Sequence, residues 1–73
     1  MERMKWETAM GIWKNLPAEE EQLLRRAACR RMIDRGCEEI GTSDVNCEVY
    51  NMVAFGDYRE EIEEQRRREK EGF

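Results

Sequence analysis

Carboxylates crowd one part of this 73-residue chain and are its most conspicuous reactive groups. Residues 37–64 include nine acidic side chains and one basic side chain, a net charge of −8. The acidic residues that we single out as candidate partner-binding groups are Glu38, Glu39, Asp57, Glu60, Glu61, Glu63 and Glu64. Carboxylates spaced over consecutive helical turns can imitate a phosphate backbone and attract a basic surface. They can equally be the solvated face of an ordinary helix, and both interpretations stay open.

A cluster of arginines precedes the acidic region. The segment from Arg25 to Arg35 holds five arginines and one acidic residue. The four that we consider as an alternative nucleic-acid contact are Arg25, Arg26, Arg30 and Arg31. Such arginines can bind phosphates, but the whole chain has a net charge of −4 and shows no signature of a nucleic-acid-binding fold. We therefore expect little direct nucleic-acid binding, and we expect Arg25 and Arg26 to pair with Glu21 or with the acidic half of the molecule.

The chain lacks the side chains on which most catalytic and metal sites depend. It contains no histidine, and no glycine-rich phosphate loop or nucleophile elbow appears in it. Cys29, Cys37 and Cys47 follow one another at intervals of eight and ten residues, which match no common zinc or iron–sulfur motif. We expect free thiols in a reducing compartment, no metal, no cofactor and no enzymatic activity.

Four helices are predicted to carry these groups, beginning with residues 4–16. Trp6, Met10 and Trp13 recur there at i, i+4 and i+7, which is the spacing of one apolar stripe on a helix. The two tryptophans can belong to the core, or they can be an anchor pair for a partner, because tryptophan is enriched at interface hot spots. A homodimer is a further expectation, since the stripe offers more apolar surface than one small core covers.

The second predicted helix extends from Pro17 to about Arg35. Proline suits the first turn of a helix, and residues 19–21 place three glutamates at its positive end. Its expected apolar row consists of Leu24, Ala28 and Met32, widened by Cys29 and Ile33. Gly36 follows the row at the position where a left-handed residue ends a helix.

Two further helices are predicted, at residues 45–53 and 57–70. The apolar positions of the first are Val45, Val49, Met52 and Val53. Three of these residues are β-branched, so a strand is not excluded there. Asp57 with Glu60 three residues later resembles the capping box that starts a helix. Beyond Ile62 the next nine residues are polar or charged, so we expect the last helix to dock by its first turn and then project into water.

Together these elements predict an all-α protein, a compact three- or four-helix small domain with a polar, projecting C-terminal helix. Residues 1–58 are expected to form the helical body, and residues 59–73 a charged helix or tail. A domain this short buries only about 60% of the surface that its unfolded chain exposes, so docking onto a partner would add stability. Because no long apolar run is present, we expect no membrane-spanning segment, no secretory signal and a cytoplasmic location.

Part of the chain resembles a known family. Residues 6–45 contain a recurring order of residue types: a tryptophan, an alanine, a proline after a leucine, an arginine, a glycine and an isoleucine. In this chain they are Trp6, Ala9, Leu16-Pro17, Arg25, Gly36 and Ile40. This order is similar to that of the small C-terminal domain of the B subunit of light-independent protochlorophyllide reductase and its free-standing relatives. The chain departs from that pattern after the proline, where Glu-Glu-Gln replaces Phe-Val-Arg, and at Gly41. The resemblance implies an accessory helical module of a reductase assembly.

The sequence thus predicts a non-catalytic acidic protein-binding module. Its expected partner is a larger protein with a basic surface, and a small inhibitor that occupies the nucleic-acid-binding surface of an enzyme is one form that this function would take. The accessory module and the arginine-helix nucleic-acid binder are the alternatives.

Overall fold

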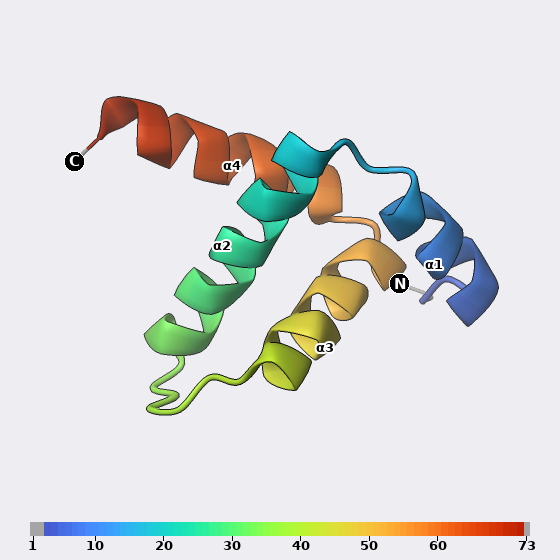
Figure 1. The fold of residues 1–73 in the computed structure, drawn as a ribbon, viewed down its shortest axis with the longest axis horizontal. Coiled ribbons are helices and arrows are strands. Elements are labelled where there is room, and N and C mark those ends of the chain that lie inside the picture. The colour runs from blue at the N-terminus through green and yellow to red at the C-terminus, as the bar shows by residue number, and fades with distance from the viewer. Residues whose placement is uncertain (1–2, 73) are drawn as a thin grey trace.

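The computed structural model describes residues 3–72, and over that range the chain forms four helices and no strand (Figure 1). The helices are α1 (Trp6–Lys14), α2 (Ala18–Asp34), α3 (Thr42–Ala54) and α4 (Tyr58–Glu71). The predicted all-α fold is confirmed, and residues 45–53, where a strand had stayed open, are helical. No helix within residues 3–72 is long and apolar enough to cross a membrane.

The turn after α2 follows directly from one glycine. Gly36 adopts a φ of +91°, which an L side chain would resist. Its N–H donates to the carbonyl of Ile33 at 2.9 Å, and the N–H of Cys37 donates to the carbonyl of Met32 at 3.0 Å. This pair of hydrogen bonds is the Schellman motif, and it reverses the chain so that α3 returns beside α2. The predicted left-handed role of Gly36 is confirmed.

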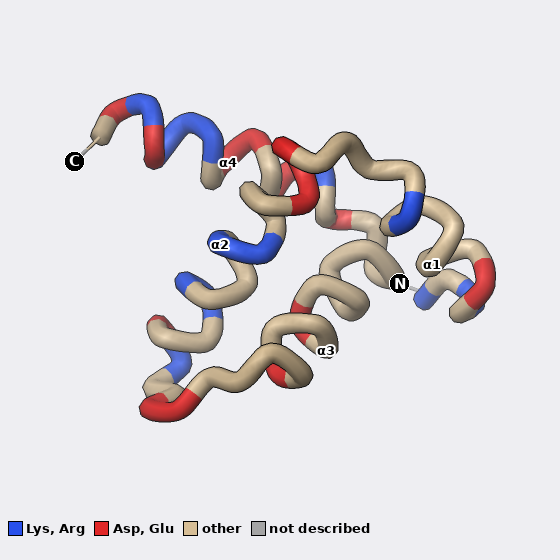
Figure 2. The backbone as a smooth tube through the Cα atoms, viewed as in Figure 1, with Lys and Arg blue, Asp and Glu red and all other residues tan. Residues whose placement is uncertain are grey.

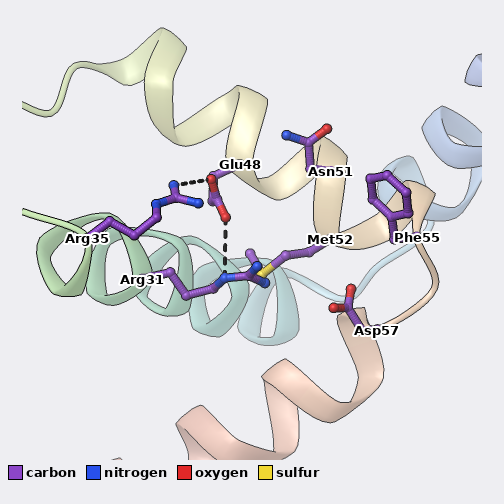
Figure 3. A pocket seen from close by; sticks show the side chains of 7 residues that line it. All are labelled: Arg31, Arg35, Glu48, Asn51, Met52, Phe55 and Asp57. Carbon is purple, nitrogen blue, oxygen red and sulfur yellow. Dashed lines mark hydrogen bonds and ion pairs between the residues drawn. The ribbon is translucent and has the colours of Figure 1, made fainter. Parts of the chain in front are cut away.

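The two later helices begin differently from each other. At the start of α3 the N–H of Gly41 donates to Oδ2 of Asp44 at 3.0 Å, which satisfies one free backbone donor. Asp57 precedes α4 but makes no side-chain capping hydrogen bond. The capping box predicted for Asp57 and Glu60 is therefore wrong, because the Asp57 carboxyl group turns toward a hollow beside α2 and α3 instead (Figure 3).

The core lies where α2, α3 and α4 meet, with α1 packed on the other side of α3 (Figure 1). Its buried residues are Ala9, Leu23, Leu24, Ala28, Val49, Met52, Val53, Ala54 and Ile62. Met32 is also buried, which confirms the predicted row on α2, but Ile33 is 62% exposed. Each residue turns by about 100° around a helix, so Ile33 points away from the row that ends at Met32.

The docking of α4 extends further than the sequence predicts. Ile62 is fully buried, and Gln65, one turn later, is only 8% exposed. The contact with α2 continues to Glu69, which lies 2.6 Å from Nε of Arg26. The expectation that only the first turn docks is therefore wrong, because polar side chains continue the interface where apolar ones stop. The end of the helix does extend beyond the rest of the molecule (Figure 1).

Charge is divided unevenly among the helices. Both α2 and α4 contain many acidic and basic residues, grouped in blocks of one sign, whereas most of α3 is uncharged (Figure 2). Within α3 the only charged residues are Asp44 and Glu48. The molecule therefore has one highly charged interface, between α2 and α4, and one face with little charge, between α1 and α3.

Candidate contact surfaces

A buried carboxylate joins α3 to α2. The side chain of Glu48 is 8% exposed, and its oxygens lie 3.3 Å from Nε of Arg31 and 2.6 Å from Nη2 of Arg35 (Figure 3). The hydrogen bond to Glu48 raises the pKa of Arg35 above its usual value. A buried carboxylate is stable only when it is paired and hydrogen-bonded, and two guanidinium groups provide both conditions here.

The same arginines continue the charge pairing onto α4. Glu61 accepts from Arg30 and from Arg31, in both cases at 3.4 Å. Arg31 therefore bridges one carboxylate of α3 and one of α4. Because Arg31, Glu48 and Glu61 each belong to a different helix, this group fixes the relative position of α2, α3 and α4.

Further along α4 the pairing ends at an exposed ion pair. Gln65 accepts from Arg30 at 3.1 Å and donates to Glu69 at 2.7 Å. The hydrogen bonds from Arg26 and then from Gln65 lower the pKa of Glu69 below its usual value. We call the whole series the charge ladder: Arg35, Glu48, Arg31, Glu61, Arg30, Gln65, Glu69 and Arg26. It begins where α3 meets α2, at Glu48, and continues along the contact between α2 and α4.

The arginines predicted as nucleic-acid contacts are thus engaged within the molecule. Besides the ladder arginines, Arg25 donates to Asn46 at 2.9 Å and lies 3.9 Å from Glu21. The prediction that Arg25 and Arg26 pair with Glu21 and with acidic residues of the C-terminal half is confirmed. To bind phosphates these arginines would have to leave carboxylates that already satisfy them, so no observation favours the nucleic-acid alternative.

Two acidic residues of α4 are neutralised by their own helix. Glu63 pairs with Arg66 at 2.9 Å. Glu64 pairs with Arg68 at 2.9 Å and also with Arg67, and the hydrogen bond from Arg67 is the main reason that the pKa of Glu64 is lowered. Such pairs screen the negative potential that a basic partner would detect.

The other predicted acidic residues do not gather into one surface. Glu38 and Glu39 lie exposed in the loop between α2 and α3, and Glu60 lies exposed on the first turn of α4. None of the ion pairs among residues 3–72 involves these three residues. Asp57 faces a polar hollow of about 270 Å³, where its Oδ1 is buried and has no hydrogen-bond partner (Figure 3). The predicted acidic set is therefore dispersed over several sites.

A different surface stands out between α1 and α3. Trp6 is 63% exposed, the highest value among the large apolar side chains of residues 3–72. It borders a hollow of about 350 Å³, which we call the α1–α3 hollow. Its walls are formed by Arg3, Trp6, Met10, Trp13, Asn46, Cys47, Tyr50 and Asn51. Aromatic and apolar side chains dominate these walls, as is typical of sites that accept a partner's side chain.

The walls of this hollow are held in place from behind. Trp13 donates its indole N–H to Glu21 at 2.9 Å and packs against the core. The guanidinium group of Arg3 lies 4.8 Å from the centre of the Tyr50 ring, a cation–π contact. Fixed aromatic walls lose little conformational entropy when a partner binds. The tryptophans can be interpreted from the sequence either as core residues or as anchors for a partner. Trp13 is partly a core residue, whereas Trp6 does not belong to the core.

The wall that α3 contributes was not identified from the sequence. Asn46, Cys47 and Tyr50 fall at i, i+1 and i+4, beside the apolar row that is buried in the core. That spacing was available as a signal, but the assignment of Tyr50 to a surface requires knowing that α1 packs against α3. Cys47 is a free, exposed thiol, and residues 3–72 contain no group of three or more cysteine or acidic side chains that could hold a metal ion.

The residues behind the family resemblance occupy structural positions. Ala9 is fully buried, Pro17 immediately precedes α2, and Gly36 forms the left-handed turn. Each of these roles serves any pair of helices with this connection, so the resemblance stays a prediction. No family model, curated protein or solved structure matches the chain, and its function has to be inferred from its own surfaces.

Proposed function

We propose that this protein is a non-catalytic protein-binding module that contacts its partner through the α1–α3 hollow. The observation that carries the proposal is the 63% exposure of Trp6 at the edge of an apolar hollow. Tryptophan is over-represented among the residues that dominate binding energy at protein interfaces. The absence of histidine from the chain supports a binding role over a catalytic one.

The chemistry of the hollow selects an apolar or aromatic side chain of the partner. Among residues 3–72, Arg3 is the only charged residue in its walls, and its guanidinium group already lies over the Tyr50 ring. No carboxylate of these described residues lines the hollow and could pair with a basic partner. Binding at this face is therefore driven by removal of apolar surface from water, and it depends little on salt.

Paired substitutions test this proposal in cells that contain the protein. Trp6→Ala removes the exposed indole, whereas Ile33→Ala removes an equally exposed apolar side chain, 62% accessible, from the far end of α2. Proteins that co-purify with each variant are compared at about 50 and 500 mM salt, which span the Debye lengths relevant here. We expect a partner that is retained at both salt concentrations, lost with Trp6→Ala and kept with Ile33→Ala. Loss with Ile33→Ala but not with Trp6→Ala would contradict the proposal.

A second candidate function is the acidic module that occupies a basic surface. It is favoured by the exposure of Glu38, Glu39 and Glu60, which make no ion pair within residues 3–72, and by the net charge of −4. Its partner would dissociate as salt rises, would be lost when these three residues are replaced by glutamine, and would be kept with Trp6→Ala. The same co-purification therefore separates the two candidates.

A further inference from the structure

The α1–α3 hollow has features that point to a particular occupant. Trp6 protrudes from one side of the same face that contains the hollow. A face that carries both a protruding indole and an aromatic-lined recess is self-complementary under a twofold axis, because each copy can place its Trp6 in the recess of the other. From this geometry we propose that the partner of the hollow is a second copy of this chain, an inference that rests on the proposed function of the same face.

Charge also favours a second copy over a partner of opposite charge. Two identical subunits repel each other wherever a charged surface meets its own copy, and α2 and α4 are densely charged (Figure 2). Within the part of the chain that the structure describes, the walls of the α1–α3 hollow contain one charge, that of Arg3, and this group is stacked on Tyr50. The hollow therefore lies in the part of the surface where like-charge repulsion is smallest.

The size of the face sets the strength of the dimer. At 1.5 Å per residue α1 and α3 are about 14 and 20 Å long, and two helices side by side are about 20 Å wide. A stable interface buries about 800 Å² on each partner, roughly a sixth of the 5165 Å² that this chain exposes. The α1–α3 face, with these dimensions, offers about 300–400 Å² in projection, about half of that area or less. The dimer is consequently weak and concentration-dependent, with a dissociation constant on the order of micromolar.

Mass measurement of the purified full-length protein tests this inference directly. Sedimentation equilibrium is recorded from about 1 to 500 μM, a range that brackets a micromolar dissociation constant. We expect a monomer–dimer equilibrium that Trp6→Ala weakens about 30-fold, as for a hot-spot residue, and that Ile33→Ala leaves unchanged. Circular dichroism checks that both variants keep their helices, which is expected because both side chains are largely exposed.

The two exposed cysteines provide an independent measurement on the unmodified protein. Cys47 lies in the wall of the hollow, whereas Cys37 lies in the loop after α2. We expect alkylation of Cys47 by iodoacetamide to slow as protein concentration rises, while the rate at Cys37 stays constant.

A monomer at every concentration would overturn the inference, and so would a dimer that survives Trp6→Ala and leaves Cys47 equally reactive. In either case the co-purification with Trp6→Ala still decides the proposed function, because a different protein in the hollow would be lost with that variant.

Discussion

The two sides of α2 and α3 are held together by different forces. On one side the charge ladder joins α2 to α3 and α4 through side chains that satisfy one another within the molecule. On the other side α1 meets α3 through aromatic and apolar groups, and Trp6 stays 63% exposed. Charged residues that suggest a binding surface in the sequence are thus paired with one another inside the fold, whereas the most exposed large apolar side chain of residues 3–72 lies on the other side.

The largest effect on stability is expected from Ile62→Ala. Ile62 is fully buried and belongs to the core, and it is the main apolar anchor of α4. Truncating a buried isoleucine costs about 2–5 kcal/mol, comparable to the whole stability of about 3–5 kcal/mol expected for a domain this small. Urea unfolding followed by circular dichroism measures the loss.

The matched comparison is Arg26→Met, which removes the exposed end of the charge ladder. The side chain of Arg26 is 50% exposed, and ion pairs of such groups contribute little. If Arg26→Met proved as destabilising as Ile62→Ala, the ladder and not the apolar anchor would hold α4.

Removing everything after Tyr58 also removes Ile62, so that truncation would unfold the body and would not isolate the role of the acidic residues.

An intermediate effect is expected from Glu48→Gln. A neutral amide cannot satisfy both Arg31 and Arg35 in the position that the buried carboxylate occupies. Leaving a buried polar group unsatisfied costs about 1–3 kcal/mol. The same urea titration measures this loss, with the exposed Glu60→Gln as the control that should change nothing. Equal stability of the two variants would indicate that the Glu48 pairing is replaceable by water.

These cross-helix pairs mark the limit of what the sequence could predict. Leu16-Pro17 and Gly36 determine where helices end through local geometry, so four helices and their approximate bounds were predictable. Glu48 is counted in the charge of residues 37–64 and nothing in the sequence distinguishes it there, yet it is buried between two arginines more than a dozen residues away. Pairing at that separation depends on how the helices pack, and neither composition nor periodicity encodes it.

A smaller effect is expected from acidification. The pKa values of Glu64 and Glu69 lie below their usual value of 4.5 because arginines donate hydrogen bonds to them. For a carboxylate with a lowered pKa in the folded state, the stabilisation is present above the unfolded pKa and is lost as the pH falls through the folded pKa. Thermal unfolding midpoints should therefore decline as the pH is lowered from about 5 to 3, an interval that begins just above the usual glutamate pKa and extends below it.

The variant Glu69→Gln provides the control for that titration. It lacks one of the two carboxylates whose pKa is lowered in the folded protein, so its midpoint should depend less steeply on pH over the same interval. If the slopes of the variant and of the unmodified protein are identical, the pairing of Glu69 with Arg26 contributes nothing to stability in solution.

The smallest effect on stability is expected from Trp6→Ala. At low protein concentration, where the monomer predominates, replacing the exposed indole removes few contacts within the molecule. Surface substitutions usually change the unfolding free energy by less than about 0.5 kcal/mol. The urea midpoint should be unchanged although binding through the α1–α3 hollow is lost. A strongly destabilised monomer would mean that Trp6 belongs to the fold and is not held available for a partner.

One backbone hydrogen bond has a practical consequence for such measurements. The N–H of Met4 donates to the carbonyl of Ala54 at 2.8 Å, which ties the segment before α1 to the end of α3. Arg3 therefore lies beside the hollow, whereas α4 extends toward the opposite side of the molecule (Figure 1). A fluorophore or surface linker attached after α4 leaves the face open to solution, whereas an N-terminal fusion would obstruct it.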